Sequence, residues 1–444
     1  MTGMANLNAT HDPARRSWIQ SANVAGCDFP IQNLPLGVFR RRGATERPRG
    51  GAAIGDQILD LGGLHGAGLL RDKAGEAVSA AAEPTLNHLM GLGLAHASIL
   101  RQELSRLLAA GGADEGERRR NLERLLVPIA HADLLLPAAI GDYTDFYASV
   151  YHATNVGRLL RPDNPLLPNY KWIPIAYHGR ASSVVPSDTR VRRPSGQIKG
   201  QNDTEPRFAP SRFLDYELEI GFFLGPGNRL GAPVPIDGAA QHIFGFCILN
   251  DWSARDIQGW EYQPLGPFLA KNFATTISPW VVTTEALAPF RTRAFTRAEG
   301  DPKPLSYLSS AIDAEEGNID MFVEAYLRSA RMRQANEPPY RLSRGNFRDL
   351  YWTPAQMLAH HASGGCNLNP GDLIATGTIS GTEKSSWGSL IEITSRGKEP
   401  IHLPTGETRT FIEDGDEILM RARCEREGYV GIGFGDCRGV VNGG

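Results

Sequence analysis

Short apolar segments separated by glycine and proline dominate the chain from about residue 135 to its end. Examples are WIPIAY, LEIGFFL, IFGFCILN, PWVVTT, DLIATGTI, SLIEIT and DEILMRARC. Many short strands joined by Gly and Pro turns are typical of β-sandwiches and rolls. The pattern therefore predicts a mainly β domain of sandwich or rolled type, with a few helices inserted.

The first third of the chain has a different pattern. Residues 37–41 and 52–61 are short apolar segments between turns, and they predict strands of a small β-domain. Residues 84–109 and 115–130 instead carry apolar residues at helical spacing. We therefore expect a small β-domain with flanking helices ahead of the larger β region.

These patterns divide the chain into three parts. Residues 1–17 are polar and predict a flexible tail. Residues 18–135 form the small N-terminal domain with its helices, and residues 136–444 form the large C-terminal domain. The predicted fold class is mainly β, within the α+β class.

The clearest single helix signal in the larger domain is YWTPAQMLAHHAS, residues 351–363. Thr353 is a good N-cap residue, because its hydroxyl can accept a hydrogen bond from a free amide of the first turn. Pro354 suits the first helical position, where no amide donor is needed. We expect a helix to begin at this pair.

Composition and charge exclude several classes of partner. The 444 residues carry a net charge of −3, so nothing favours a nucleic-acid or acidic-membrane partner. No run approaches the roughly 18 apolar residues that span a membrane. The five cysteines are scattered and suggest neither a disulfide framework nor a zinc site. We expect a soluble cytoplasmic protein, and find no nucleotide-binding, zinc-protease or serine-hydrolase motif.

The stretch DYELEI raises a chemical question. Strand side chains alternate, so Glu217 and Glu219 share one face, where they repel each other and are costly to bury. Asp145 and Asp251 add further carboxylates, and oxygen-only ligands suit Mg²⁺ or Ca²⁺ better than zinc. Two alternatives remain open: the carboxylates pair with arginines, or the strand has one solvated face.

Other polar residues also have two readings. His152 is either a base or a hydrogen-bonded structural residue. Lys271 lies inside the apolar PFLAKNF, where it either acts on a ligand or extends its ammonium to solvent. GTISGT, residues 377–382, is either a functional loop or an ordinary turn. Residue types alone do not choose between these readings.

Long ordered motifs decide between them. DYTDFYASVYHATNVG, YHGRASSVV, RRPSGQ, DYELEIGFFLGPGNRLG, IFGFCILNDWSARDIQGWEYQPLGPFLAKNFATTISPWVV, CNLNPGDLIATGTISG and GYVGIGFGDCRG resemble the fumarylacetoacetase family, the full-length form of the fumarylacetoacetate hydrolases. The resemblance runs from about Trp18 to Gly439. It implies a small N-terminal SH3-like barrel, a larger C-terminal β-roll or β-sandwich, and a homodimer.

The resemblance also implies roles for individual residues. The implied metal ligands are Asp145, Glu217, Glu219 and Asp251, with Lys271 and Thr275 beside a second, magnesium-type site. The implied substrate contacts are Tyr147, Arg161, Gln258, Tyr262 and Thr378, with Tyr177 as a further candidate. The implied catalytic groups are His152 as general base, Glu392 orienting it, and Arg255, Gln258 and Lys271 around an oxyanion. Because an ammonium is a poor ligand for a cation, we expect Lys271 to serve mainly as a charge facing the substrate.

The implied activity is hydrolysis of the C–C bond of 4-fumarylacetoacetate to fumarate and acetoacetate, the last step of tyrosine and phenylalanine degradation. The implied cofactor is Mg²⁺, Ca²⁺ or both, and the partner is the small-molecule substrate. One alternative is a hydrolase, decarboxylase, hydratase or isomerase of another diketo or oxo acid on the same fold. An alternative of another class is a non-catalytic metal-binding β-protein.

Overall fold

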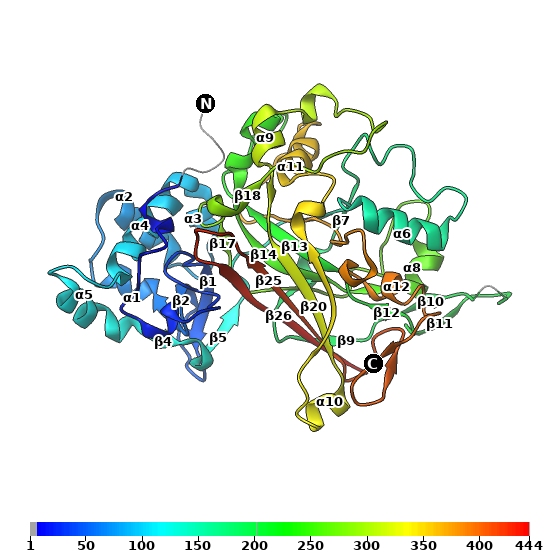
Figure 1. The fold of residues 1–444 in the computed structure, drawn as a ribbon, viewed down its shortest axis with the longest axis horizontal. Helices are drawn as coiled ribbons and strands as arrows, with labels where there is room; N and C mark the ends of the chain where they lie inside the picture. The colour runs from blue at the N-terminus through cyan, green and yellow to red at the C-terminus, as the bar shows by residue number, and fades with distance from the viewer. Residues whose placement is uncertain (1–6, 201, 444) are drawn as a thin grey trace.

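The computed structural model describes residues 7–200 and 202–443, with a smaller N-terminal part beside a larger β-rich part (Figure 1). Residues 1–6 of the predicted tail lie outside the described residues. Residues 7–17 differ from the predicted flexible tail, because Thr10 and His11 are buried. His11 Nε2 lies 2.9 Å from the carbonyl oxygen of Glu285, which fastens this segment to the larger domain.

The N-terminal part contains a five-stranded antiparallel sheet. Its strand order is β4 (Leu126–Pro128), β3 (Gln57–Asp60), β2 (Arg49–Ile54), β1 (Leu36–Arg41) and β5 (Ala132–Leu135). The predicted segment 52–61 is a hairpin that turns at Gly55, where φ is +58° and glycine is favoured. A small antiparallel sheet of this kind is consistent with the SH3-like expectation.

Five helices flank this sheet: α1 (Leu61–Gly66), α2 (Asp72–Ala81), α3 (Asn87–Leu92), α4 (Leu94–Leu108) and α5 (Glu115–Leu122). The helix predicted over 115–130 is therefore wrong beyond Leu122. Its last residues pair with β3 as an edge strand, where Ile58 lies opposite Val127. Pro128 is tolerated at such an edge but would interrupt a helix.

Two sheets form the larger part. The eight-stranded sheet has the order β7 (Ala176–His178), β6 (Tyr143–Phe146), β22 (Leu373–Ala375), β13 (Leu218–Leu224), β14 (Ile243–Asp251), β16 (Thr275–Ile277) and β8 (Val184–Pro186), with β17 (Val282–Thr283) also beside β14. The five-stranded sheet has the order β21 (Tyr340–Asn346), β20 (Phe322–Arg328), β25 (Glu417–Cys424), β26 (Ile432–Asn442) and β9 (Arg190–Arg192). The two sheets pack together where β14 contacts β25 and β26.

Shorter elements complete the larger part. The remaining strands are β10 (Ser195–Ile198), β11 (Arg207–Pro210), β12 (Leu214–Asp215), β15 (Ser253–Ala254), β18 (Arg291–Thr292), β19 (Asn318–Ile319), β23 (Ile401–His402) and β24 (Thr408–Arg409). The α-helices are α6 (Val150–Leu160), α7 (Ile236–Ala239), α8 (Arg255–Glu261), α9 (Ala311–Glu316), α10 (Ala330–Gln334), α11 (Pro354–Ala362) and α12 (Leu390–Ile393). The mainly β, α+β prediction is confirmed.

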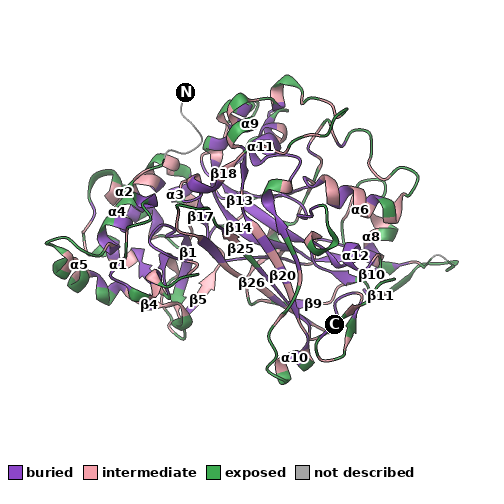
Figure 2. Cartoon of the chain, in the orientation of Figure 1, coloured by how far each residue is buried: buried purple, intermediate pink, exposed green. Residues whose placement is uncertain are grey.

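The central strands of the large sheet are buried on both faces (Figure 2). Along β13, Phe222 packs into the core between the two sheets. Phe223 points the other way, into a second core that Leu249 of β14 shares with the N-terminal helices. Burial on both faces explains why these strands read as continuous apolar runs rather than as alternating ones. Glu219 lies on the same strand face as Phe223.

Helix α11 confirms the clearest helix prediction. Thr353 is its N-cap and accepts a hydrogen bond from the amide of Gln356, whose side chain bonds back to the cap in a capping box. Pro354 occupies the first turn, as predicted.

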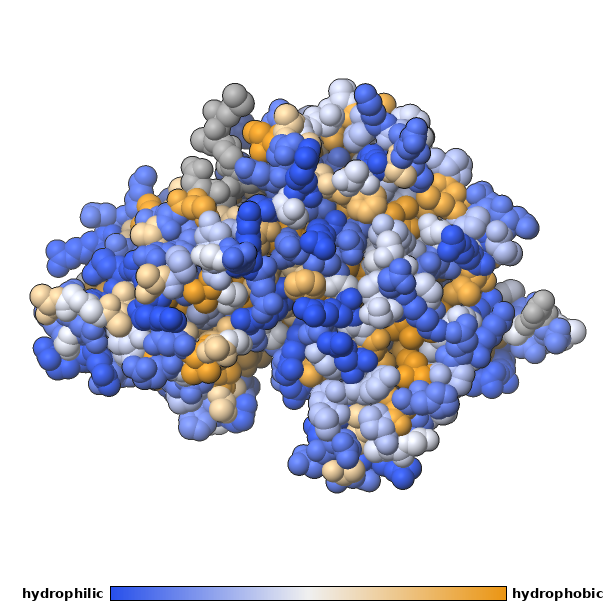
Figure 3. Space-filling view, viewed as in Figure 1, coloured by the Kyte–Doolittle hydropathy of each residue, from blue (hydrophilic) through white to orange (hydrophobic). Residues whose placement is uncertain are grey.

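The surface agrees with the modest net charge. The face in Figure 3 is mostly hydrophilic, with separate hydrophobic groups among the polar ones. Within residues 7–200 and 202–443, no helix has both the length and the apolar character needed to cross a membrane.

Candidate active site

A cavity of about 1120 Å³ opens at the eight-stranded sheet, among strands β6, β7 and β13 and helices α6, α8 and α12. The predicted site residues that line it are Asp145, Tyr147, His152, Arg161, Tyr177, Glu217, Glu219, Arg255, Gln258, Tyr262, Lys271 and Thr378. The other three predicted residues, Asp251, Thr275 and Glu392, are buried just behind the wall. Asp251 and Glu392 contact the lining residues Lys271 and His152, and Thr275 contacts Asp251. Residues spread over the sequence therefore meet in one place.

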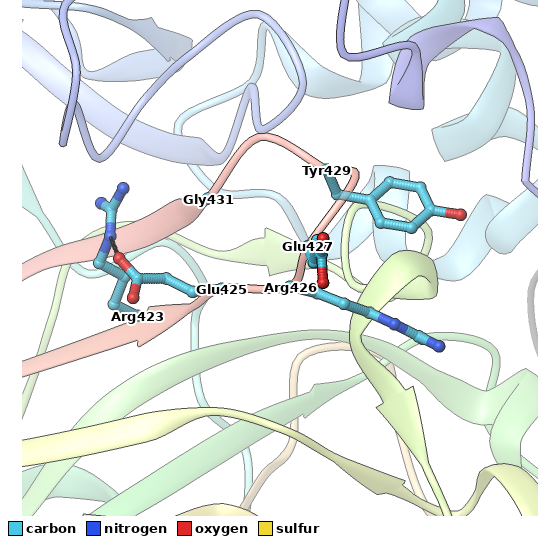
Figure 4. A pocket seen from close by; sticks show the side chains of 6 residues that line it. All are labelled: Arg423, Glu425, Arg426, Glu427, Tyr429 and Gly431. Atoms are coloured by element: carbon cyan, nitrogen blue, oxygen red, sulfur yellow. Dashed lines mark hydrogen bonds and ion pairs between the residues drawn. The ribbon is translucent and has the colours of Figure 1, made fainter.

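A second pocket, of about 370 Å³, is smaller, and its lining side chains are drawn in Figure 4. It is lined by Arg423, Glu425, Arg426, Glu427, Tyr429 and Gly431, so the predicted site residues, all of them described, lie elsewhere. The larger cavity is the candidate active site.

Three carboxylates converge beside the cavity. Asp145 of β6, Glu219 of β13 and Asp251 at the end of β14 each offer one oxygen, and these oxygens lie within 4.8 Å of one another. The sheet order explains this, because β22 alone separates β6 from β13, and β13 pairs directly with β14. All three residues are buried.

This cluster is short of positive partners. Asp145 Oδ1 and Glu219 Oε1 are buried and have no hydrogen-bond partner among the described residues. Burial raises the pKa of both carboxyls well above the usual range, and the neighbouring carboxylates raise the pKa further. Buried oxygens without donors, all of them hard ligands, fit a divalent cation such as Mg²⁺ or Ca²⁺.

Glu217 is different, although it is close by. Its carboxylate lies 2.8 Å from Arg255 Nη1 and also contacts the Lys271 ammonium. Burial raises the pKa of Glu217, but Lys271 and Arg255 outweigh it and hold the pKa well below the usual range. Of the alternatives left open by the sequence, ion pairing describes Glu217, whereas the unpartnered oxygen of Glu219 fits a cation site. The solvated-face alternative is wrong, since both glutamates are buried.

Lys271 also reaches the carboxylate cluster, with Nζ 2.6 Å from Asp251 Oδ2. It is only 7% exposed, so its ammonium does not extend to solvent. Tyr177 donates to the same oxygen of Asp251 at 2.7 Å, and Thr275 Oγ1 lies 3.5 Å from the other oxygen. Arg255 contacts Glu217, and Lys271 contacts both Glu217 and Asp251, so two cations face the four predicted carboxylate ligands and do not balance their charge.

His152 lies on the first turn of α6, which Ser149 caps. Its Nδ1 is 2.7 Å from Glu392 Oε2, although the two residues are 240 positions apart in sequence. Because a carboxylate can only accept, this contact places the proton on Nδ1 and leaves Nε2 free to act as a base. Nε2 lies on the Glu217 side, 3.8 Å from Glu217 Oε1.

Glu392 is held by several donors besides His152. Ser389 Oγ and Ser380 Oγ donate to its Oε2 at 2.6 and 3.0 Å, and Asn155 Nδ2 donates to Oε1 at 3.0 Å. Burial raises the pKa of Glu392, but electrostatic attraction to His152 and these hydrogen bonds outweigh it, so the pKa lies below the usual value. The carboxylate is therefore ionised and fixed in position.

The remaining predicted residues surround the cavity. Arg255 starts α8 and donates to Gln258 Oε1 at 3.1 Å, while Tyr262 closes the same helix. Arg161 closes α6, and its buried Nε has no hydrogen-bond partner among the described residues. Tyr147 lies against the His152 ring, with the ring centroids 5.3 Å apart.

The GTISGT segment is more than an ordinary turn. The amide of Gly377 donates to Glu219 Oε2 at 3.0 Å. Gly377 has φ +75°, and a Cβ there would lie 2.2 Å from the carbonyl oxygen of Phe146, so only glycine fits. Thr378 follows, with its buried Oγ1 lacking a partner within the described chain.

Comparison with known proteins agrees with this geometry. The family model described as "Fumarylacetoacetate (FAA) hydrolase C-terminal" matches residues 143–442. A second model, "Fumarylacetoacetase N-terminal", matches residues 32–137. The chain belongs to the fumarylacetoacetase family.

Curated members of the fumarylacetoacetase family match at high identity. The Bos taurus fumarylacetoacetase is 49% identical over 420 residues, covering 93% of this chain and 96% of its own length. The Rattus norvegicus fumarylacetoacetase is 48% identical over 417 residues, with the same coverage. A solved fumarylacetoacetate hydrolase from Exiguobacterium antarcticum has a TM-score of 0.49 at 17% identity, covering 93% of this chain and 100% of that one.

Several residues at this fumarylacetoacetase-family site escaped the sequence reasoning. Tyr143 donates to Asp145 Oδ2 at 3.2 Å, and it precedes Asp145 by two, so strand periodicity could have placed it on the same face. Asp215 likewise continues the alternation of Glu217 and Glu219. Nothing in the sequence marked Ser380, Ser389 or Asn155.

Proposed function

We propose that the chain hydrolyses the C–C bond of 4-fumarylacetoacetate, giving fumarate and acetoacetate. The observation that carries the proposal is the contact of 2.7 Å between His152 Nδ1 and the buried Glu392, in a cavity that also holds the carboxylate cluster. A base and a divalent-cation site in one cavity suit hydrolysis of a diketo acid. The names of the curated relatives support the same substrate.

Asp145, Glu219 and Asp251 would hold Mg²⁺, Ca²⁺ or both, and Glu217 is proposed as the fourth carboxylate of the set. Bound there, the cation would supply Lewis-acid polarisation of the two ketone oxygens of the substrate. Tyr177 would hold Asp251 in place. Thr275 is proposed to border a second, magnesium-type site, supported by its contact with Asp251.

His152 would act as the general base. Its Nε2 takes a proton from a water, whose oxygen attacks the carbonyl carbon next to the alkene. Glu392 keeps the proton on Nδ1 and stabilises the imidazolium that forms. Four polar contacts hold Glu392, so the base is pre-oriented before substrate arrives.

Lys271, Arg255 and Gln258 would stabilise the oxyanion of the tetrahedral intermediate. One well-placed donor of this kind commonly contributes about 3–4 kcal/mol to the barrier reduction. Arg161, whose buried Nε has no partner among the residues that the structure describes, would bind a terminal carboxylate through its guanidinium. Tyr147, Tyr262 and Thr378 complete the substrate contacts.

Collapse of the intermediate breaks the C–C bond. The electron pair leaves with the acetoacetate part as an enolate, and the His152 imidazolium returns its proton to the carbon released. The hydroxyl of the water remains on the fumaryl carbon in a new carboxyl group, which releases its proton to solvent and becomes the carboxylate. One water is consumed and no oxidant or reductant is needed.

A spectrophotometric assay tests the proposal. Fumarylacetoacetate and an acylpyruvate are supplied separately, and loss of ultraviolet absorbance of the conjugated diketone is followed. We expect turnover of fumarylacetoacetate, loss of activity on exhaustive chelation, and recovery when Mg²⁺ or Ca²⁺ is added back. Faster turnover of the acylpyruvate would favour the alternative substrate class. Metal binding without turnover of either would favour the non-catalytic alternative.

The proposed working form is a cytoplasmic homodimer. Exposed apolar side chains outside the cavity lining support a partner surface, since Phe268 and Phe208 are 64% and 74% exposed. All five cysteines are free, which suits a reducing compartment. Light scattering on the purified protein would give about twice the mass of the chain, and a monomeric mass would contradict the dimer.

A further inference from the structure

We infer that Asp215 is a positioning residue that fixes Arg255 and the His152–Glu392 pair relative to each other, an inference that rests on the proposed function. Asp215 ends β12 and is fully buried, behind the wall of the cavity rather than in its lining. It therefore does not touch the substrate space. Any effect it has on catalysis must pass through the groups that it holds.

One side of Asp215 holds the guanidinium of Arg255. Arg255 Nε donates to Asp215 Oδ2 at 2.9 Å, and Nη2 lies 2.9 Å from the same oxygen. This contact fixes the plane of the guanidinium. It leaves Nη1 directed at the cavity, where it meets Glu217 and Gln258.

The same carboxylate also holds the helix that carries Glu392. The amide of Leu390 donates to Asp215 Oδ1 at 2.8 Å, and the amide of Ile391 donates to Oδ2 at 3.0 Å. These are the first two amides of α12, which have no partner inside the helix. The preceding residue, Ser389, does not cap them, because its hydroxyl donates to Glu392 instead.

Asp215 therefore replaces the missing N-cap from a distant part of the chain. The replacement sets Ser389 free to orient Glu392, which in turn orients His152. A single carboxylate links the proposed oxyanion group on α8 to the proposed base on α6. An amide could not do this, since it offers one accepting oxygen and would turn an N–H₂ toward the other donors.

The chain offers a matched control for a purely structural role. Asp416 is also fully buried, and its carboxylate accepts from Arg409 Nε at 2.8 Å, from Arg409 Nη2 at 3.0 Å and from the amide of Glu413 at 2.9 Å. Neither Asp416 nor its partners line the cavity. Asp416→Asn thus removes the same kind of buried carboxylate–arginine contact without touching the site.

The experiment compares Asp215→Asn with Asp416→Asn in the metal-loaded protein. Both should lower Tm. Only Asp215→Asn should lower kcat, by about 10- to 100-fold, the range seen when outer partners of functional groups are removed. KM and Mg²⁺ affinity should stay within about threefold in both. Retention of kcat within about twofold in a folded Asp215→Asn would overturn the inference, as would an equal fall in Asp416→Asn.

Two further measurements keep the test decisive. The His152 Nδ1 proton, identified by its loss in Glu392→Gln, should shift in proton NMR of Asp215→Asn and stay unchanged in Asp416→Asn. This readout needs no turnover, so inactive wild type would count against the proposed function alone. If Asp215→Asn does not fold, Asp215→Glu keeps the charge for Arg255. It should recover Tm without recovering kcat, and full recovery of kcat would contradict a positional role.

Discussion

Glu392 and Glu219 are buried glutamates of the same site with opposite surroundings. Glu392 accepts from three side-chain donors besides its contact with His152. Glu219 accepts a hydrogen bond from the amide of Gly377, and its Oε1 has no partner among residues 7–200 and 202–443. A fully bonded carboxylate is fixed and can orient a neighbour, whereas an under-bonded one keeps lone pairs for a ligand.

The pKa directions follow the same division. Donors and His152 bring the pKa of Glu392 below its usual value, while burial among like charges takes the pKa of Glu219 well above it. The two groups should therefore respond differently to substitution. Three experiments test that difference, beginning with the residue that Glu392 orients, and a fourth tests the effect of burial on a carboxylate outside the site.

His152→Ala should have the largest effect. Removing a general base typically costs about 10²–10⁴ in rate, so kcat should fall by orders of magnitude while Tm and Mg²⁺ affinity remain close to wild type. His11→Ala is the control, because His11 is a similarly buried histidine that contacts Glu285 instead of the site. Turnover of His152→Ala within about tenfold of wild type would assign the base elsewhere.

Glu219→Gln and Glu392→Gln should separate metal binding from orientation. Neutralising Glu219 should weaken Mg²⁺ or Ca²⁺ binding at least about tenfold. It should keep or raise Tm in the presence of chelator, because a buried carboxyl with a raised pKa costs free energy near neutral pH and a glutamine does not ionise. Glu392→Gln should lower Tm and kcat while leaving metal affinity near wild type. Calorimetric titration measures the metal affinity of both variants, and thermal melts measure their Tm. Weaker metal binding in Glu392→Gln together with a lower Tm in Glu219→Gln would refute the assigned roles.

Asp313→Asn tests a buried carboxylate far from the cavity. Asp313 accepts from the Thr353 hydroxyl, and burial raises its pKa to about 6. The folded protein then holds this proton when the unfolded chain has lost it, so stability falls as pH rises from about 4 to 6. Relative to wild type, the variant should gain about 1–2 kcal/mol between pH 5 and pH 7.5. Denaturant titrations at both pH values measure it, and a pH-independent difference would contradict the shift.

Ser380→Ala should have the smallest effect. It removes one of the donors to Glu392 and leaves those of Ser389 and Asn155 in place. We expect a loss of about 1 kcal/mol in stability, typical of one hydrogen bond, and a fall in kcat of less than about tenfold. A fall in kcat as large as that of Glu392→Gln would mean that Ser389 and Asn155 cannot hold Glu392 in place without Ser380.

Local signals predicted the local structure well. Thr353 and Pro354 marked the start of α11, and the apolar runs marked strands that are buried on both faces. The failure at residues 123–130 has a tertiary cause. Apolar residues at helical spacing in this segment instead form strand β4, because they pair with β3. The local sequence pattern contains no information about that pairing.

The site was likewise predictable from the sequence only in part. Periodicity alone placed Glu217 and Glu219 on one face but could not show which of them meets cations. The His152–Glu392 pair was predictable only from the family resemblance, because no spacing links residues 240 positions apart. Asp215 belongs to the DYELEI stretch, but its inferred role depends on α12. The fold brings this helix, which is distant in sequence, into contact with Asp215.

The core shared by Phe223, Leu249 and the N-terminal helices has a practical consequence. The amide of Val281 donates a hydrogen bond to the Leu36 carbonyl at 2.7 Å. The N-terminal part and the larger part are therefore also joined by a backbone hydrogen bond. A truncated chain of residues 138–444 would expose to solvent the apolar face that Phe223 and Leu249 form on the eight-stranded sheet. The same sheet carries the carboxylates of the site. Such a fragment should aggregate rather than function as an independent domain. Truncated versions of this enzyme should therefore retain the N-terminal third of the chain.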